Sequence, residues 1–128
     1  MRPITTPRAP APAGHYAQAV EHAGLIFTAG LLPVVAGSGE KVLGSIEEQA
    51  ERVLSNLEAI LEAAGSGRDR VLRVTVYLTD LGLWGRFNEV YARFFGDHRP
   101  ARTVVPVTEL HHGFLLELEA VAAAGASA

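Results

Sequence analysis

Cysteine is absent from this chain of 128 residues. Its absence excludes disulfide bonds, thiolate catalysis and cysteine-ligated zinc sites together. It leaves the redox compartment open, although it agrees with a cytoplasmic location.

Long apolar runs are missing as well, and none approaches the roughly 18 residues that a membrane-spanning helix needs. Residues 1–13 contain Arg2 and Arg8 but no apolar segment, so they lack the pattern of a secretory signal. With a formal net charge of -3 at pH 7, the chain also lacks the basic surplus typical of proteins that bind nucleic acid. We therefore expect a soluble, cytoplasmic protein without a membrane or nucleic-acid partner.

Apolar residues make up 48% of the chain and charged residues 20%, which is the balance of a globular protein. The length fits a single domain, residues 1–128, which can bury about two-thirds of its unfolded surface. Four prolines within residues 1–13 predict an extended N-terminal arm, and the small residues at 123–128 predict a frayed tail.

Two segments have the pattern of amphipathic helices. Ser45 and Glu48 have the spacing of a capping box, and apolar residues then recur every three or four positions up to residue 64. Gly65 is typical of a helix end. A second helix is predicted at about residues 83–95, ending before Gly96. We expect its aromatic residues to lie in the core rather than to stack on a ligand: Trp84, Phe87, Tyr91, Phe94 and Phe95.

Five segments predict strands, at residues 14–20, 25–30, 71–79, 100–107 and 114–122, with a turn at 21–24. The two longest alternate between an apolar and a polar face. In the third strand we expect Leu72, Val74, Val76 and Leu78 to face the core. In the last strand Leu116, Leu118 and Ala120 point one way, and Glu117, Glu119 and Val121 point the other.

The order of elements is strand, strand, helix, strand, helix, strand, strand. Two amphipathic helices and one mixed sheet pack most economically with both helices on one sheet face, as an α+β two-layer sandwich. The other face then has no helix to cover it. It would carry polar groups together with apolar Val71, Val121 and Phe27, so we expect another copy of the chain to cover it, with a site at the subunit boundary.

Charged residues inside apolar strands are the most informative feature of the chain. Arg102 opens a β-branched run, and Glu117 and Glu119 lie within an apolar strand. Such charges are paired, solvated or used for function. The residues alone leave two alternatives open: Arg102 pairs structurally with Glu117 or Glu119, or it binds a ligand.

Several short motifs occur in the order and spacing of the Rid (YjgF/RidA) family of reactive-intermediate deaminases, also named the endoribonuclease L-PSP family. The chain resembles that family from about residue 11 to residue 122. The motifs are Gly14-His15-Tyr16-Ala17-Gln18-Ala19, Phe27-Thr28-Ala29-Gly30, Phe87-Asn88-Glu89-Val90-Tyr91, Pro100-Ala101-Arg102 and Glu117-Leu118-Glu119-Ala120.

The resemblance implies a chorismate-mutase-like fold, a homotrimer with clefts between subunits, and no metal or organic cofactor. The implied reaction is hydrolysis of enamines or imines, such as 2-aminoacrylate and 2-iminobutanoate, to 2-oxo acids and ammonia. By position, Arg102 would hold the substrate carboxylate and Glu117 would orient or activate water. Tyr16, Gly30, Leu31 and Val104 match positions that line the cleft.

Three positions depart from the pattern that many members of the family share. His15 stands where proline is common, Leu31 where glutamine is common and Val104 where cysteine is common. His111 and His112 replace a segment that more usually contains proline. These departures indicate a divergent subgroup with a different substrate pocket.

The adjacent pair His111-His112 does not have the spacing of a metal site, so we expect an exposed loop. Tyr16 is equally compatible with a simple interfacial aromatic. Two other functions stay open: a non-catalytic binder of small carboxylates that uses the same arginine, and an endoribonuclease, which fits poorly with the net charge.

Overall fold

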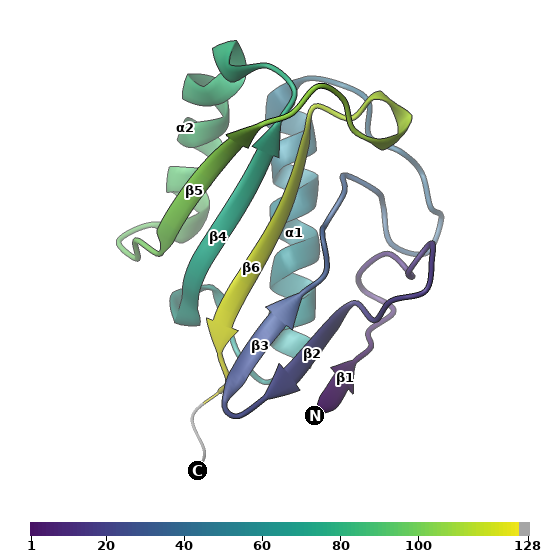
Figure 1. The fold of residues 1–128 in the computed structure, drawn as a ribbon, viewed down its shortest axis with the longest axis vertical. Helices are drawn as coiled ribbons and strands as arrows, with labels where there is room; N and C mark the ends of the chain where they lie inside the picture. The colour runs from purple at the N-terminus through teal and green to yellow at the C-terminus, as the bar shows by residue number, and fades with distance from the viewer. Residues whose placement is uncertain (126–128) are drawn as a thin grey trace.

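The computed structural model describes residues 1–125. Two helices cover one face of a six-stranded mixed sheet, as Figure 1 shows with the helices behind the sheet. The predicted α+β two-layer fold is therefore confirmed. The elements are β1 (Arg2–Ile4), β2 (Ala19–His22), β3 (Leu25–Thr28), α1 (Ile46–Ala63), β4 (Val71–Leu78), α2 (Trp84–Phe95), β5 (Ala101–Pro106) and β6 (Leu116–Ala123).

The sheet has the strand order β1-β2-β3-β6-β4-β5. Only the β4–β5 pair is parallel, because α2 carries the chain back from the end of one strand to the start of the next. The last strand, β6, pairs with both β3 and β4 and so joins the two halves of the sheet. Residues 2–22 lie at one edge and β5 at the other (Figure 1).

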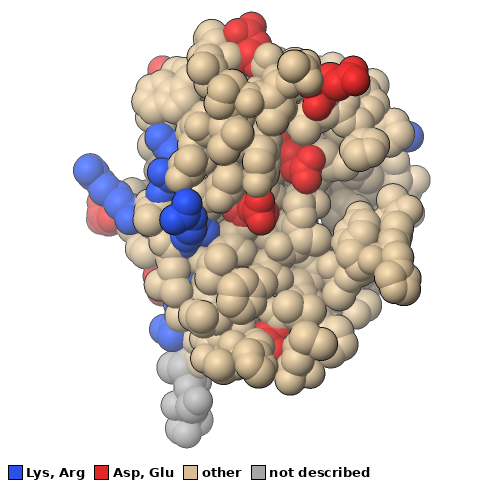
Figure 2. All heavy atoms as spheres, viewed as in Figure 1, with Lys and Arg blue, Asp and Glu red and all other residues tan. Residues whose placement is uncertain are grey.

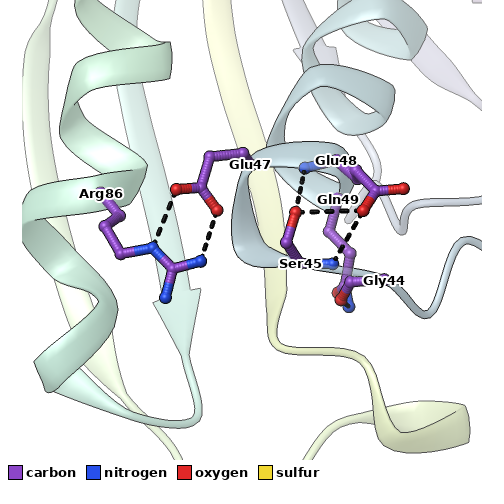
Figure 3. Close-up of polar contacts among 6 residues, drawn as sticks. All are labelled: Gly44, Ser45, Glu47, Glu48, Gln49 and Arg86. Atoms are coloured by element: carbon purple, nitrogen blue, oxygen red, sulfur yellow. Dashed lines mark hydrogen bonds and ion pairs between the residues drawn. The ribbon is translucent and has the colours of Figure 1, made fainter.

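The helix α1 begins where the sequence predicts. The Ser45 hydroxyl accepts a hydrogen bond from the Glu48 backbone N–H at 3.2 Å, and the Glu48 carboxylate accepts one from the Ser45 N–H at 3.3 Å (Figure 3). This capping box satisfies donors that the first turn leaves free. The predicted apolar face is buried throughout: Ile46, Ala50, Val53, Leu54, Leu57, Ile60, Leu61 and Ala64.

Two buried polar residues of α1 hold neighbouring loops in place. Gln49 accepts a hydrogen bond from the Leu115 N–H at 2.9 Å and donates one to the Gly44 carbonyl at 3.0 Å. Asn56 donates to the carbonyl oxygens of Leu32 and Val34, at 3.2 and 2.9 Å. The helix therefore fixes the segment that follows β3 as well as the start of β6.

An ion pair ties the first turn of α1 to the first turn of α2 (Figure 3). Arg86 donates from Nε to Glu47 Oε2 at 2.8 Å and from Nη2 to Oε1 at 2.6 Å. The hydrogen bonds from Arg86 lower the pKa of Glu47 to about 2, and the same bonds raise the pKa of Arg86. This bidentate ion pair fixes the position of α2 relative to α1.

The sequence assigned the first residues of β4 to the wrong faces of the sheet. A β-bulge between Val71 and Arg73 shifts the register against β6, so that Val71 is buried and Leu72 is 47% exposed. From Val74 onward the predicted alternation is confirmed, since Val74, Val76 and Leu78 are buried. The bulge therefore removes Val71 from the uncovered face, while Phe27 remains on it and is 41% exposed.

The N-terminal region also differs from prediction. Residues 2–4 form the edge strand β1 against β2, and residues 14–18 are not a strand. Buried Gln18 holds the arm: its Oε1 accepts from the Thr6 N–H at 2.7 Å, and its Nε2 donates to the Thr6 and Pro10 carbonyls. The turn occupies only Ala23 and Gly24, both at positive φ, which is the geometry of a tight hairpin.

The C-terminal prediction is only partly covered by the structure. Ala123 still belongs to β6, and residues 126–128 of the predicted frayed tail lie outside the described residues. Within residues 1–125, no helix has the length and apolar character to cross a membrane.

Candidate active site in two parts

The predicted site residues lie on two different sides of the sheet. Arg102 is in register with Val74 of β4, which is itself paired with Ala120, and both of these partners are buried under the helices. Glu117 is in register with Tyr77 and points to the opposite, uncovered face. Because cross-strand partners share a face, Arg102 and Glu117 of one chain cannot contact the same small ligand.

The Arg102 guanidinium lies against α2. It donates from Nη1 to Asn88 Oδ1 at 2.7 Å, and its central carbon lies 4.7 Å from the centre of the Tyr91 ring and 5.5 Å from that of Trp84. Among residues 1–125 it makes no ion pair and no other hydrogen bond. The predicted alternative of structural pairing with Glu117 or Glu119 is therefore wrong within one chain.

An open groove of about 490 Å³ borders Arg102, and its lining includes Asn88, Tyr91, His98, Arg99 and Pro100. Trp84 is 41% exposed, so the prediction that it belongs to the core is wrong. Its ring instead contributes to the surroundings of the guanidinium. The side of the sheet that carries Arg102 therefore offers an unneutralised cation at an accessible surface.

Burial and neighbouring charge tune the carboxyl group of Glu117. Its half-buried position raises the pKa, His111 opposes that rise, and Glu119 adds to it. Glu119 is engaged differently, because it accepts a hydrogen bond from the Tyr77 hydroxyl, and that bond raises the pKa of Tyr77. Of the two carboxylates, Glu117 is the one without a hydrogen-bond donor among the described side chains.

Gly30 lies where β3 departs from β6. The ladder ends at Phe27–Val121 and resumes with a bridge between Leu31 and Leu118, and the Thr28 hydroxyl accepts the Ala120 N–H at 3.0 Å in between. The Glu117 carboxylate packs directly onto Gly30. This position therefore needs glycine for space, not for an unusual backbone angle.

A cavity of about 270 Å³ lies beside Gly30. Three predicted cleft residues line it, namely Tyr16, Gly30 and Leu31, together with Gln18, Asn56 and His112. The remaining predicted cleft residue, Val104, is in register with buried Val76 and packs against the core on the helix side. The structure thus groups Tyr16, Gly30, Leu31 and Glu117 in one part, and Arg102 with Val104 in the other.

Figure 2 shows the uncovered face, which is mostly uncharged with acidic groups near its middle and basic groups at one margin. Glu117 and Glu119 lie on this face in neighbouring positions of β6. The pattern agrees with the expectation of a surface that another molecule covers.

The sequence did not single out Asn88, His111 or His112 as functional residues. Asn88 lies on α2 between Phe87 and Glu89, and the sequence pattern gives no sign that it contacts Arg102. The prediction of an exposed loop for the histidine pair is confirmed, yet His111 acts on the pKa of Glu117 and His112 lines the cavity. Within residues 1–125, no cluster of three or more acidic or histidine side chains could hold a metal ion.

Comparison with known proteins places these features in a family. The family model described as Endoribonuclease L-PSP matches residues 6–124. A RutC family protein of Pyrococcus abyssi is 46% identical over 119 residues, covering 93% of this chain and 94% of that protein.

Solved structures agree. The crystal structure of TM0215 from Thermotoga maritima, described there as an endoribonuclease by provisional assignment, has a TM-score of 0.94 and 45% identity, covering 98% of this chain and 99% of its own. TdcF of Escherichia coli, provisionally named a reactive intermediate deaminase, was solved with bound serine; it has a TM-score of 0.91 and 37% identity, with 96% and 98% coverage. The chain therefore belongs to the Rid (YjgF/RidA) family, whose matching model carries the description Endoribonuclease L-PSP.

Proposed function

We propose that this protein hydrolyses reactive enamines and imines of the 2-aminoacrylate and 2-iminobutanoate type to 2-oxo acids and ammonia. One observation supports the proposal: the Arg102 guanidinium borders an open groove and has no carboxylate partner among residues 1–125. A guanidinium without a carboxylate partner is complementary in charge and geometry to the carboxylate that every such substrate carries. The serine bound to the relative TdcF is likewise a small molecule with a carboxylate.

Glu117 is the residue that transfers protons in the proposed reaction. An enamine first gains a proton at its terminal carbon and loses one from nitrogen, which gives the imine. Water then adds to the carbon of the C=N bond, and the resulting carbinolamine collapses to the 2-oxo acid as ammonia leaves. A carboxyl group beside the substrate accepts a proton from the attacking water and returns one to the departing nitrogen, so protons balance. Burial raises the pKa of Glu117 above its ordinary value, which makes its carboxylate a better proton acceptor. The cavity beside Gly30 gives room for the side chain of the substrate.

Arg102 and Glu117 must come from different subunits, because each chain presents them on opposite faces of its sheet. We propose a homotrimer in which the groove of one subunit meets the Glu117 face of the next. The uncovered sheet face supports this assembly, since it carries Phe27 and Val121 beside the two glutamates. Each closed ring of this kind contains as many complete sites as subunits.

The direct test generates 2-iminobutanoate in solution and follows its decay with and without the protein. Wild type is expected to accelerate the decay. The rate with Arg102→Ala is expected to be roughly 10–150-fold lower, because this variant loses one charge-assisted contact. Equal rates with wild type and Arg102→Ala would remove the proposal.

A second test asks whether the site spans two subunits. Arg102→Ala and Glu117→Gln chains are each expected to be strongly impaired, but an equal mixture, unfolded and refolded together, contains interfaces with both intact residues. Random assembly makes about one quarter of the sites complete. Recovery of about that fraction of wild-type activity supports a shared site, whereas a mixture as inactive as its components places both residues in one subunit's site.

A non-catalytic binder of small carboxylates is the alternative, and the separation of Arg102 from Glu117 within a chain favours it if the subunits do not assemble. Binding of 2-oxobutanoate without turnover of 2-iminobutanoate would establish that role. The endoribonuclease role in the family's description has less support, because the net charge is -3. RNA cleavage that is lost in Arg102→Ala would revive it.

A further inference from the structure

Three residues on one face of α2 surround the Arg102 guanidinium. Trp84, Asn88 and Tyr91 are spaced four and three residues apart, so they lie one above the other along the helix. The rings of Trp84 and Tyr91 lie 5.5 and 4.7 Å from the guanidinium carbon, and Asn88 Oδ1 accepts the Nη1 hydrogen bond at 2.7 Å. The rings and the amide restrict the guanidinium from different directions.

All three partners are neutral. An amide oxygen orients Arg102 through a hydrogen bond but leaves its positive charge uncompensated. The hydroxyl of Tyr91 is buried and has no hydrogen-bond partner among the described residues, and burial raises the pKa of Tyr91 to about 12, so it stays protonated at neutral pH. Within residues 1–125, no Asp or Glu forms an ion pair with Arg102.

The hydrogen bond to Asn88 also leaves free the Arg102 donors that a carboxylate can use. Asn88 takes one of the five N–H groups of the guanidinium, on Nη1. The donors on Nη2 and Nε remain without partners among the described residues, and this edge can bind a carboxylate through two parallel hydrogen bonds. The bond to Asn88 therefore determines which edge of Arg102 is available to the groove.

We propose that Asn88 is a positioning residue for carboxylate recognition: it fixes the Arg102 guanidinium through a neutral acceptor and preserves its charge for the substrate. This inference rests on the proposed function, because its readout is carboxylate binding by Arg102. An aspartate at the same position would have nearly the same shape but would neutralise Arg102. The proposal therefore assigns the specificity of the site to the amide group itself.

The experiment measures the dissociation constant of 2-oxobutanoate at pH 7 by calorimetry, and the melting temperature, for the full chain and its variants. Asn88→Asp is expected to bind at least about tenfold more weakly while melting at the same or a higher temperature, because it gains an ion pair with Arg102. A purely structural residue would instead lose stability and binding together. Asn88→Ala is expected to raise KM for 2-iminobutanoate by about tenfold with a smaller change in kcat, since the guanidinium loses its orientation.

Ser55→Asp is the matched control, because it adds the same charge at an exposed position of α1. It is expected to bind like wild type. The proposal is overturned if Asn88→Asp and Asn88→Ala both bind 2-oxobutanoate within twofold of wild type, or if Asn88→Asp loses binding only as it loses stability. Arg102→Ala distinguishes failure of the proposed function from failure of the role of Asn88. If Arg102→Ala binds 2-oxobutanoate as tightly as wild type, the proposed function is wrong. If Arg102→Ala loses binding while both Asn88 variants keep it, only the role of Asn88 is wrong.

Discussion

The Glu117 carboxylate lies against the backbone of Gly30 so closely that a Cβ at position 30 would be 2.0 Å from Glu117 Oε2. No real side chain tolerates that distance, so the carboxylate can keep its place only beside a glycine. The residue at position 30 therefore determines where the Glu117 carboxylate lies, and so affects the proposed reaction indirectly.

The first prediction concerns Gly30→Ala. The added methyl group is expected to displace the Glu117 carboxylate, which is the mobile end of a side chain, and to leave the fold intact. A displacement of about 1 Å can cost roughly 10²-fold in rate, so kcat/KM for 2-iminobutanoate is expected to fall by about that factor. The measurement combines steady-state kinetics with circular dichroism.

Gly85→Ala is the control for this variant. A Cβ at position 85, on the exposed side of α2, would meet no atom within 4 Å. It is expected to keep full activity and to gain about 0.5–1 kcal/mol of stability from the helix preference of alanine. Full activity in Gly30→Ala would show that the exact place of the carboxylate does not matter.

The second prediction concerns Glu117→Gln and pH. Because burial raises the pKa of Glu117 above its ordinary value of 4.5, the folded chain binds this proton more tightly than the unfolded chain. Its contribution to stability is therefore lost as pH rises through the folded pKa. Glu117→Gln is expected to melt higher than wild type at pH 7, to converge with it below pH 4.5, and to lose about 10²–10⁴-fold in activity.

Thermal melts between pH 4 and pH 8 check this prediction, with Glu119→Gln as the control two residues away. Glu119 already accepts a hydrogen bond from Tyr77, so its replacement is expected to bring no gain in stability. A lower melting temperature for Glu117→Gln at pH 7 would contradict the assignment of a half-buried carboxyl group whose pKa is raised in the folded chain.

Much of the fold could be predicted because its signals are periodic. The capping box at Ser45 and the apolar positions of α1 recur with the period of a helix, and β6 alternates over its whole length. The bulge at Val71–Arg73 could not be predicted, since one extra residue in a strand leaves the composition unchanged while exchanging the faces. Likewise, Pro3 argues against a strand except at a sheet edge, which is where β1 lies.

The candidate site could be predicted only as a set of residues. Arg102, Glu117, Tyr16 and Gly30 were identified through motifs, but their separation into two parts depends on the register of β5 against β4. In β5 the sequence Arg102-Thr103-Val104-Val105 does not alternate between polar and apolar residues, so the sequence does not assign a face. The contact from Asn88 to Arg102 joins residues on two elements, and single-sequence periodicity carries no signal for such a contact.

The third prediction concerns assembly through the uncovered face. Phe27 is 41% exposed on this face and lies between Val20 and Val121 on the neighbouring strands. Phe27→Asp is expected to convert the proposed trimer to monomers, because burying an unpaired carboxylate in an interface costs several kcal/mol. Activity is expected to be lost with the assembly, since Arg102 and Glu117 then no longer meet.

Light scattering coupled to gel filtration measures the oligomeric state of this variant. Leu43→Asp is the control, because Leu43 is 57% exposed and lies in the loop before α1. It is expected to remain a trimer with full activity. A Phe27→Asp protein that is trimeric and active would place the interface elsewhere.

The fourth prediction concerns the ion pair between the helices. The pKa of Glu47 is lowered to about 2 by Arg86, so this carboxylate stabilises the fold above its unfolded pKa of 4.5, and the contribution is lost as pH falls toward 2. Glu47→Gln is expected to melt lower than wild type at pH 7 and to converge with it near pH 2. Because both side chains are exposed, about 1 M salt is expected to reduce the difference as well.

Glu51→Gln is the control for Glu47→Gln, because Glu51 is an exposed acid of the same helix without an ion pair among the described residues. It is expected to melt like wild type at every pH. Since Arg86 lies two residues from Asn88 and faces away from Arg102, activity at 25 °C is expected to change less than twofold. A pH-independent loss of stability in Glu47→Gln would mean that packing of the side-chain stem, and not its charge, joins α1 to α2.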